Sequence, residues 1–193
     1  MATTMAMTLA VAGALAGCAS TSRVTDQLTR NALLRGQQAV AILGFTFEGQ
    51  RCKVTNALLA QESQPGLYRG LRPIKIVDAW PDAGGIPQVR LKPGTYHIVF
   101  VSCGVGARVF KVGQPASNFA LSPHYRQSLA SFTVGPGEIV NLGMLRLSGF
   151  AGRNAARVDV VAMPPGALAM LRRQRPNLAA QMVSRAMVAG AGG

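Results

Sequence analysis

Short apolar runs, bounded by Gly, Pro or polar residues, fill the chain between residues 39 and 163. Runs of this length that are rich in Val, Ile, Leu and Phe predict β-strands, and the residues between them predict turns. Many short strands with regular turns favour a mainly β protein, built as a sandwich or a barrel. We expect strands at residues 39–47, 53–59, 74–79, 88–91, 96–103, 108–112, 127–134, 139–147 and 158–162.

The run at 96–103 is apolar on both faces of the predicted strand. Successive side chains of a strand point to opposite sides, so alternate residues share a face. A sandwich strand usually has one solvated face, and we therefore expect another part of the chain to cover the outer face of this strand. The two faces are Tyr96, Ile98 and Phe100 on one side, and Val99, Val101 and Cys103 on the other.

The C-terminal part, residues 164–193, is the candidate cover. Residues 167–173 and 177–188 have helical patterns separated by Pro176. Leu178, Met182 and Ala186 recur at the spacing of one helical face. We expect this face to pack on a sheet; the alternative is a surface for a partner or a membrane. The last residues, from 189 onward, are expected to form a flexible tail.

Two Pro-Gly pairs, Pro93-Gly94 and Pro136-Gly137, predict type II turns. Proline presets the first central φ of such a turn, and glycine supplies the positive φ needed at the second. Because these turns do not match the twist of a tight hairpin, we expect them to carry the chain from one sheet to the other.

The first of these turns begins a Pro-Gly-x-Tyr sequence at 93–96, which resembles a strand start in carboxypeptidase-regulatory-like, transthyretin-type domains. The segment 137–143 is similar to one found in small bacterial lipoproteins, although Asn141 stands where those proteins often have Tyr. The resemblance implies an immunoglobulin-like β-sandwich. It implies no catalytic residue.

An apolar stretch at residues 5–16 ends in a Leu-Ala-Gly-Cys sequence at 15–18. This resembles a bacterial lipoprotein signal peptide, and implies that residues 1–17 are removed and Cys18 is lipidated. The implied location is the cell envelope, facing the periplasm, and the absence of Asp at position 19 favours the outer membrane. An ordinary secretory signal cut nearby is the alternative. The stretch is too short for a membrane span, which needs roughly 20 apolar residues.

These patterns divide the chain into four parts. After the signal peptide at 1–17 we expect a lipidated tether at 18–38, which includes a short helix near 26–34 with Asp26 as its cap. The β-sandwich follows at 39–163, and the helical cover and tail at 164–193. Hydrophobic residues make up 49% of the 193 residues, enough for the core of one domain.

With Cys18 assigned to the lipid anchor, Cys52 and Cys103 remain. An even pair in an exported protein predicts a disulfide bond. The alternative is two buried free thiols. Two cysteines alone do not complete a tetrahedral metal site, so we expect no metal ion.

The chain has 20 Lys and Arg but only 7 Asp and Glu, for a net charge of +13. A basic surface attracts anions, and an exported protein meets anionic lipids, envelope polymers and acidic proteins rather than nucleic acid. The densest cationic cluster is Arg172, Arg173 and Arg175. Guanidinium groups bind phosphate and carboxylate in a fork, so this cluster is the candidate anion or partner site; a solvated helix face is the alternative.

The sequence offers little catalytic chemistry. It has two histidines, His97 and His124, and no Gly-x-Ser-x-Gly elbow, zinc motif or phosphate loop. We therefore expect a non-enzymatic binding or scaffolding protein without a cofactor. The alternative is a small periplasmic hydrolase, which would need a deep polar cleft around one of the histidines.

Overall fold

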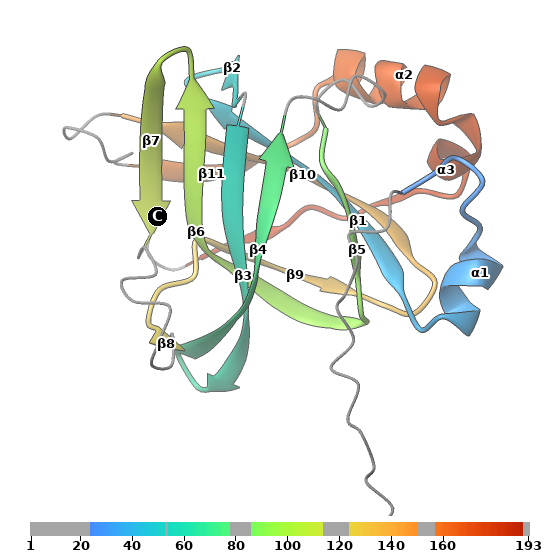
Figure 1. Ribbon diagram of the computed structural model, residues 1–193, viewed down its shortest axis with the longest axis horizontal. Helices are drawn as coiled ribbons and strands as arrows, with labels where there is room; N and C mark the ends of the chain where they lie inside the picture. Colours follow the sequence, from blue (N-terminus) through green and yellow to red (C-terminus); the bar gives the residue numbers. More distant parts are fainter. Residues whose placement is uncertain (1–23, 53, 78–85, 114–123, 150–156, 191–193) are drawn as a thin grey trace, which may run out of the picture.

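The computed structural model describes residues 24–52, 54–77, 86–113, 124–149 and 157–190 (Figure 1). The fold is mainly β, as the sequence predicts, with two sheets and three helices among these residues. Cys18 and the predicted signal peptide lie outside the described residues.

The first sheet has the strand order β11-β10-β1-β2, with β5 paired to β1 and β12 paired to β10. Its strands β1 and β10 are parallel, with Val40 opposite Ile139 and Phe47 opposite Leu147. The strands of this sheet are β1 (Ala39–Phe47), β2 (Gln50–Arg51), β5 (Gln88–Leu91), β10 (Ile139–Ser148), β11 (Arg157–Val161) and β12 (Val183–Ser184).

The second sheet has the order β13-β9-β6-β3-β4-β8, with β7 paired to β6. All of its pairs are antiparallel. Its strands are β3 (Val54–Gln64), β4 (Leu67–Val77), β6 (Gly94–Val105), β7 (Arg108–Gly113), β8 (His124–Tyr125), β9 (Ala130–Val134) and β13 (Val188–Ala189).

All nine expected strands are present, and those at 39–47 and 88–91 have the expected bounds. The β3–β4 hairpin is longer than expected at its turn end. The polar sequence at 61–64 carries no apolar alternation, but its backbone continues the ladder, with Glu62 opposite Tyr68. The two-residue strands β2 and β8 were not expected, because their pairing depends on a neighbouring strand and not on their own composition.

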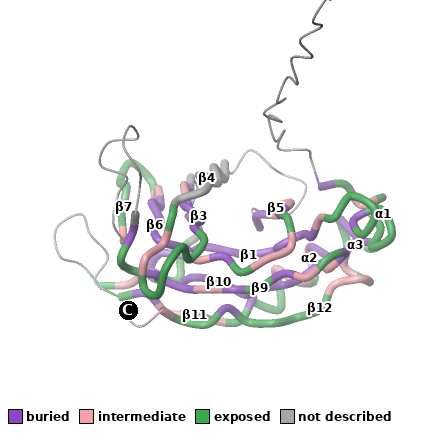
Figure 2. The backbone as a smooth tube through the Cα atoms, turned by 90° about the horizontal axis from the view of Figure 1, so that it is seen from below, coloured by how far each residue is buried: buried purple, intermediate pink, exposed green. Residues whose placement is uncertain are grey.

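Every residue of β1 is buried. Ala41, Leu43 and Phe45 belong to the core between the sheets, whereas Val40 and Ile42 belong to a second core on the other side of the first sheet. Figure 2 shows this buried path along β1 and β10, in contrast to exposed stretches of β7 and β12. Burial on both faces explains the continuous apolar run at 39–47.

The second core is covered by α1 (Arg30–Arg35), α2 (Pro165–Gln174) and α3 (Pro176–Ala180), which gather at one end of the molecule, here called the helical end (Figure 1). Leu171 and Leu178 are fully buried against Val40 and Ile42. The C-terminal part therefore packs on a sheet, as expected. The expectation that it covers the strand at 96–103 is wrong, since that strand belongs to the other sheet.

The outer face of β6 has its own cover. Tyr68 of β4 and Tyr125 of β8 pack there with Leu58, Ala60 and Val99. The expected alternation along 96–103 is wrong beyond Ile98, because a register shift opposite Leu58 and Leu59 inserts a β-bulge. Tyr96, Ile98, Val101 and Cys103 consequently face the core between the sheets, while Val99 and Phe100 belong to the outer cluster.

The expected helix at 177–188 is wrong after residue 180. Instead, β12 pairs in parallel with β10, and β13 pairs with β9 of the second sheet. This segment thus bonds to both sheets, and Met187 enters the core between them. Asn141 helps to hold this segment, because its Nδ2 donates a hydrogen bond to Ser184 Oγ at 3.2 Å.

The flexible tail expected from residue 189 onward is shorter than expected. Ala189 is in β13, and Gly190 N donates a hydrogen bond to Leu129 O.

Both Pro-Gly sequences join the two sheets, as expected, but the type II turn expected at Pro93-Gly94 is wrong, because Gly94 has φ +152° instead of about +80° and already begins β6. The Pro93-Gly94 sequence connects β5 to β6, and the turn at Pro136-Gly137 connects β9 to β10. Gly137 has φ +71°, and a Cβ at this position would overlap the side chain of Leu34 in α1. Glycine is therefore favoured at position 137 for two reasons: the positive φ of the backbone, and the close approach of α1.

The predicted disulfide bond is present between Cys52 and Cys103, whose Cα atoms are 5.0 Å apart. Cys52 follows β2 of the first sheet, and Cys103 lies on β6 of the second. The bond therefore ties the two sheets together across their common core.

Candidate functional site

The predicted cationic cluster is divided by the fold. Arg172 and Arg173 are exposed near the end of α2. Arg175 is 8% exposed, and its Nη1 donates a hydrogen bond of 2.8 Å to the carbonyl oxygen of Val24. The expectation of three arginines on one exposed surface is therefore wrong for Arg175, because the chain leaves α2 there and turns the side chain inward.

The segment that follows the predicted signal is joined to α3 by side-chain contacts. Asp26 accepts hydrogen bonds from Leu178 N and Asn177 Nδ2, at 3.1 and 2.9 Å. Gln181 Nε2 donates to Leu28 O at 3.4 Å. The expected helix near 26–34 begins only at Arg30, with Thr29 as its cap, because the Asp26 side chain contacts the start of α3 instead.

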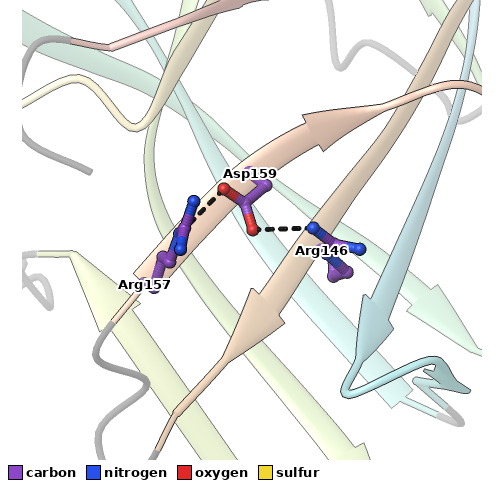
Figure 3. Close-up of polar contacts among 3 residues, drawn as sticks. All are labelled: Arg146, Arg157 and Asp159. Atoms are coloured by element: carbon purple, nitrogen blue, oxygen red, sulfur yellow. Dashed lines mark hydrogen bonds and ion pairs between the residues drawn. The ribbon is translucent and has the colours of Figure 1, made fainter.

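Two carboxylates, those of Asp159 and Glu138, form ion pairs with arginines of the protein. On β11, Asp159 lies between two cations, Arg146 at 3.1 Å and Arg157 at 3.0 Å (Figure 3). The hydrogen bond from Arg146, followed by that from Arg157, lowers the pKa of Asp159. Glu138 bonds to Arg185 at 2.8 Å, and this contact is the largest cause of its lowered pKa. With few acids available, most of the positive charge stays uncompensated.

A hollow of about 370 Å³ lies on the outer side of the second sheet. It is formed by β4, β6, β9, β13 and the segment 126–128, and its lining residues are Tyr68, His97, Arg126, Gln127, Ser128, Ser131, Ala189 and Gly190. Of these residues, only His97 stood out in the sequence as a candidate for chemistry. The register pairs His97 with Ser131 of β9 and with Ala60 of β3, and no local pattern indicates those partners.

His97 is half-buried and held by two neighbours. Its Nδ1 lies 3.2 Å from Ser128 Oγ, and its ring centroid lies 4.4 Å from that of Tyr68. Ser128 Oγ donates its proton to Ala130 O at 3.1 Å. With the Ser128 proton directed to Ala130 O, the hydroxyl has none left for His97, so in this arrangement Nδ1 carries the proton of the neutral ring and Nε2 does not. Burial lowers the pKa of His97, and the charge of Glu62 partly opposes this.

This arrangement does not form a nucleophile and base pair. A base that activates serine must accept its proton, whereas a Ser128 proton that is directed to the Ala130 carbonyl oxygen is not shared with His97. Ser128 is also buried, at 9% exposure. The hollow therefore has a mixed polar and apolar lining, in which His97 and Ser128 hold each other in place.

The second histidine, His124, lies in β8 opposite Arg69 of β4 and is not among the residues that line the hollow. Within the described ranges, no group of three His, Cys, Asp or Glu residues could hold a metal ion. In the same part of the chain, no helix is both long and apolar enough to cross a membrane.

No protein-family model matches this chain, and no curated protein matches it. Among solved structures, the chain shows a likeness to a leucine-rich repeat protein from Bacteroides thetaiotaomicron, with a TM-score of 0.30 and 12% sequence identity. The match covers 63% of this chain and 14% of the other protein.

Proposed function

We propose that this protein is a non-enzymatic binding or scaffolding domain of the bacterial cell envelope, held at the membrane by lipid on Cys18 and facing the periplasm, with the outer membrane as its location. The signal-like sequence at 1–18 supports export and lipidation. The disulfide bond between Cys52 and Cys103 supports export independently, because such bonds persist in oxidising compartments.

The observation that carries this proposal furthest is the attachment of Val24 to the helical end. Val24 is buried and bonded to Arg175, and it follows Cys18 by only six positions. At about 3.5 Å per residue, that segment reaches at most about 20 Å. A lipid on Cys18 therefore keeps the helical end near the bilayer, and the rest of the domain extends away from it.

The helical end is suited to an anionic surface, which supports a second function as a binder of anionic lipid or envelope polymer. Arg30 and Arg35 of α1 and Arg172 and Arg173 of α2 are all exposed there. Each arginine near an anionic membrane contributes about 1 kcal/mol of attraction. The charge and the anchor act together, because the lipid concentrates the arginines at the head groups.

At the level of the fold, we infer an immunoglobulin-like sandwich related to transthyretin-type domains. Tyr96 supports this inference, since its ring is in the core and its hydroxyl donates a 2.7 Å hydrogen bond to Lys92 O, four residues earlier. Such a tyrosine corner is typical of these sandwiches. The parallel pairing of β1 with β10 departs from a purely antiparallel sandwich.

Mass spectrometry of the amino terminus tests the anchor. The full chain, expressed in a bacterium and purified from membranes, should begin at an acylated Cys18. The Cys18→Ser variant should carry no acyl chain, and an Ala19→Ser variant should be acylated like the wild type. A mature wild-type chain that begins at another residue, without lipid, would refute the anchor while leaving the disulfide prediction intact.

Hydrogen–deuterium exchange tests the proposed membrane contact. The lipidated protein would be reconstituted into neutral vesicles and into vesicles with anionic lipid. We expect slower exchange in α1 and α2 on the anionic vesicles, with β7 unchanged as the internal reference. Arg172→Gln with Arg173→Gln should remove much of the difference, whereas Arg108→Gln with Lys111→Gln on β7 should not. Equal exchange on both vesicles would exclude the lipid contact.

A further inference from the structure

The hollow beside His97 has the composition of an anion site. Arg126 provides a full positive charge, and Ser131 and Gln127 are neutral polar residues, whereas the Ser128 hydroxyl is already bonded to His97 and Ala130. None of the described residues that line it is an Asp or Glu. The negative charge that acts on His97 is that of Glu62, near the end of β3, whose Oε1 accepts a 2.9 Å hydrogen bond from Gly66 N.

We propose that this hollow binds an oxyanion, either a carboxylate or a phosphate group, through the guanidinium of Arg126 and the hydroxyl of Ser131, beside the ring of His97. Guanidinium groups recognise both oxyanions with paired hydrogen bonds. The site lies on the second sheet, whereas α2 and its arginines cover the first. It is thus independent of the lipid anchor and of the helical end.

Two close contacts shape the wall. Ala60 lies opposite His97, and its small side chain leaves room for the rings of His97 and Tyr68 to meet across β3. Gly190 follows β13 and approaches Ser128 so closely that a Cβ would overlap the Ser128 carbonyl oxygen. The hydrogen bond from Gly190 N to Leu129 O holds this approach.

The ring of His97 is a preformed part of the wall. Ser128 holds one edge of the imidazole and Tyr68 packs against its face, so little side-chain entropy is lost there when a ligand enters. The volume, about 370 Å³, is near the lower limit for small-molecule pockets, which begin at about 300 Å³. It therefore fits a small acid or the charged end of a longer molecule.

Histidine NMR tests the proposal, because the chain has two histidines. The full-length protein, labelled at histidine and kept in a neutral detergent, would be titrated at constant ionic strength with inorganic phosphate in one arm and acetate in the other. We expect saturable shifts of the His97 ring resonances and no saturable shift at His124. The arm that saturates at lower concentration identifies the preferred oxyanion.

Arg126→Gln should weaken this binding about tenfold or more, since it removes the charge but keeps a polar side chain. Arg108→Gln, an equal charge change on the exposed β7, is the matched control and should bind like the wild type. Unchanged His124 resonances in both variants would show that the fold is intact. Equal or non-saturating shifts at both histidines, or full binding by Arg126→Gln, would overturn the proposal. Each outcome is independent of whether Cys18 is lipidated.

Discussion

Arg175 donates a hydrogen bond from Nη1 to the carbonyl oxygen of Val24 at 2.8 Å, joining residues that lie 151 positions apart. Both residues are buried, with exposures of 8% and 1%. Together with the contacts of Asp26 to Asn177 and Leu178, this bond makes the beginning of the described chain part of the folded body. The predicted tether at 18–38 is thus shorter than expected, because its second half is packed.

Replacing Arg175 with Ala should reduce the free energy of unfolding by about 2 kcal/mol, because a hydrogen bond to a charged group contributes about 1.5–3 kcal/mol and the Val24 carbonyl loses its partner. Urea denaturation of the full-length protein measures this. Arg173→Ala is the control; its side chain is exposed, and the change should stay within about 0.5 kcal/mol. Equal effects of the two substitutions would contradict a structural role for Arg175.

Replacing both Cys52 and Cys103 with Ala should lower the free energy of unfolding by about 2–5 kcal/mol, the usual effect of losing a native disulfide. The bond spans 51 positions and joins the two sheets, so its loss frees a long loop in the unfolded chain. When the wild-type protein is unfolded without reductant, a thiol reagent should label neither Cys52 nor Cys103. Two reactive thiols in that sample would show that the bond is absent.

Two buried tyrosines should respond in opposite ways to replacement by Phe. Tyr96 Oη donates to Lys92 O at 2.7 Å, so Tyr96→Phe should cost about 1 kcal/mol of stability. Tyr125 is 2% exposed and its Oη has no hydrogen-bond partner among the described residues, so Tyr125→Phe should be neutral or stabilising. Urea midpoints of the two variants, compared with wild type, measure the difference. A larger loss for Tyr125→Phe would contradict this distinction.

His97 should make stability depend on pH. Because burial lowers its pKa in the folded protein below the usual 6.5, the unfolded chain binds the proton more readily. The stability linked to His97 is therefore complete above about pH 6.5 and is lost as the pH falls through the folded pKa. Urea denaturation at several pH values should show this slope in the wild type and in His124→Gln, and a weaker slope in His97→Gln. An identical slope in His97→Gln would assign the effect to other groups.

Local residue patterns predicted much of this fold correctly. The strands at 39–47 and 88–91 and the two Pro-Gly crossings follow from preferences that act over a few residues, such as side-chain alternation and the φ angles of Pro and Gly. The pairing of Cys52 with Cys103 followed because the lipoprotein-like signal accounted for Cys18 and left two cysteines. The hollow beside His97, in contrast, was not predicted, because its other lining residues come from distant strands.

Local sequence patterns thus specify the mainly β class, the positions of the principal strands and the connections between the sheets. The bulge after Ile98, the extended course of the chain beyond residue 180 and the inward position of Arg175 arise only in the folded molecule. These features depend on partners far away in the chain. Near residues 183–188 the local pattern indicates a helix, but backbone pairing with β10 and β9 holds the chain extended. Local propensity is worth only tenths of a kcal/mol per residue, so pairing and burial between distant segments prevail wherever the two conflict.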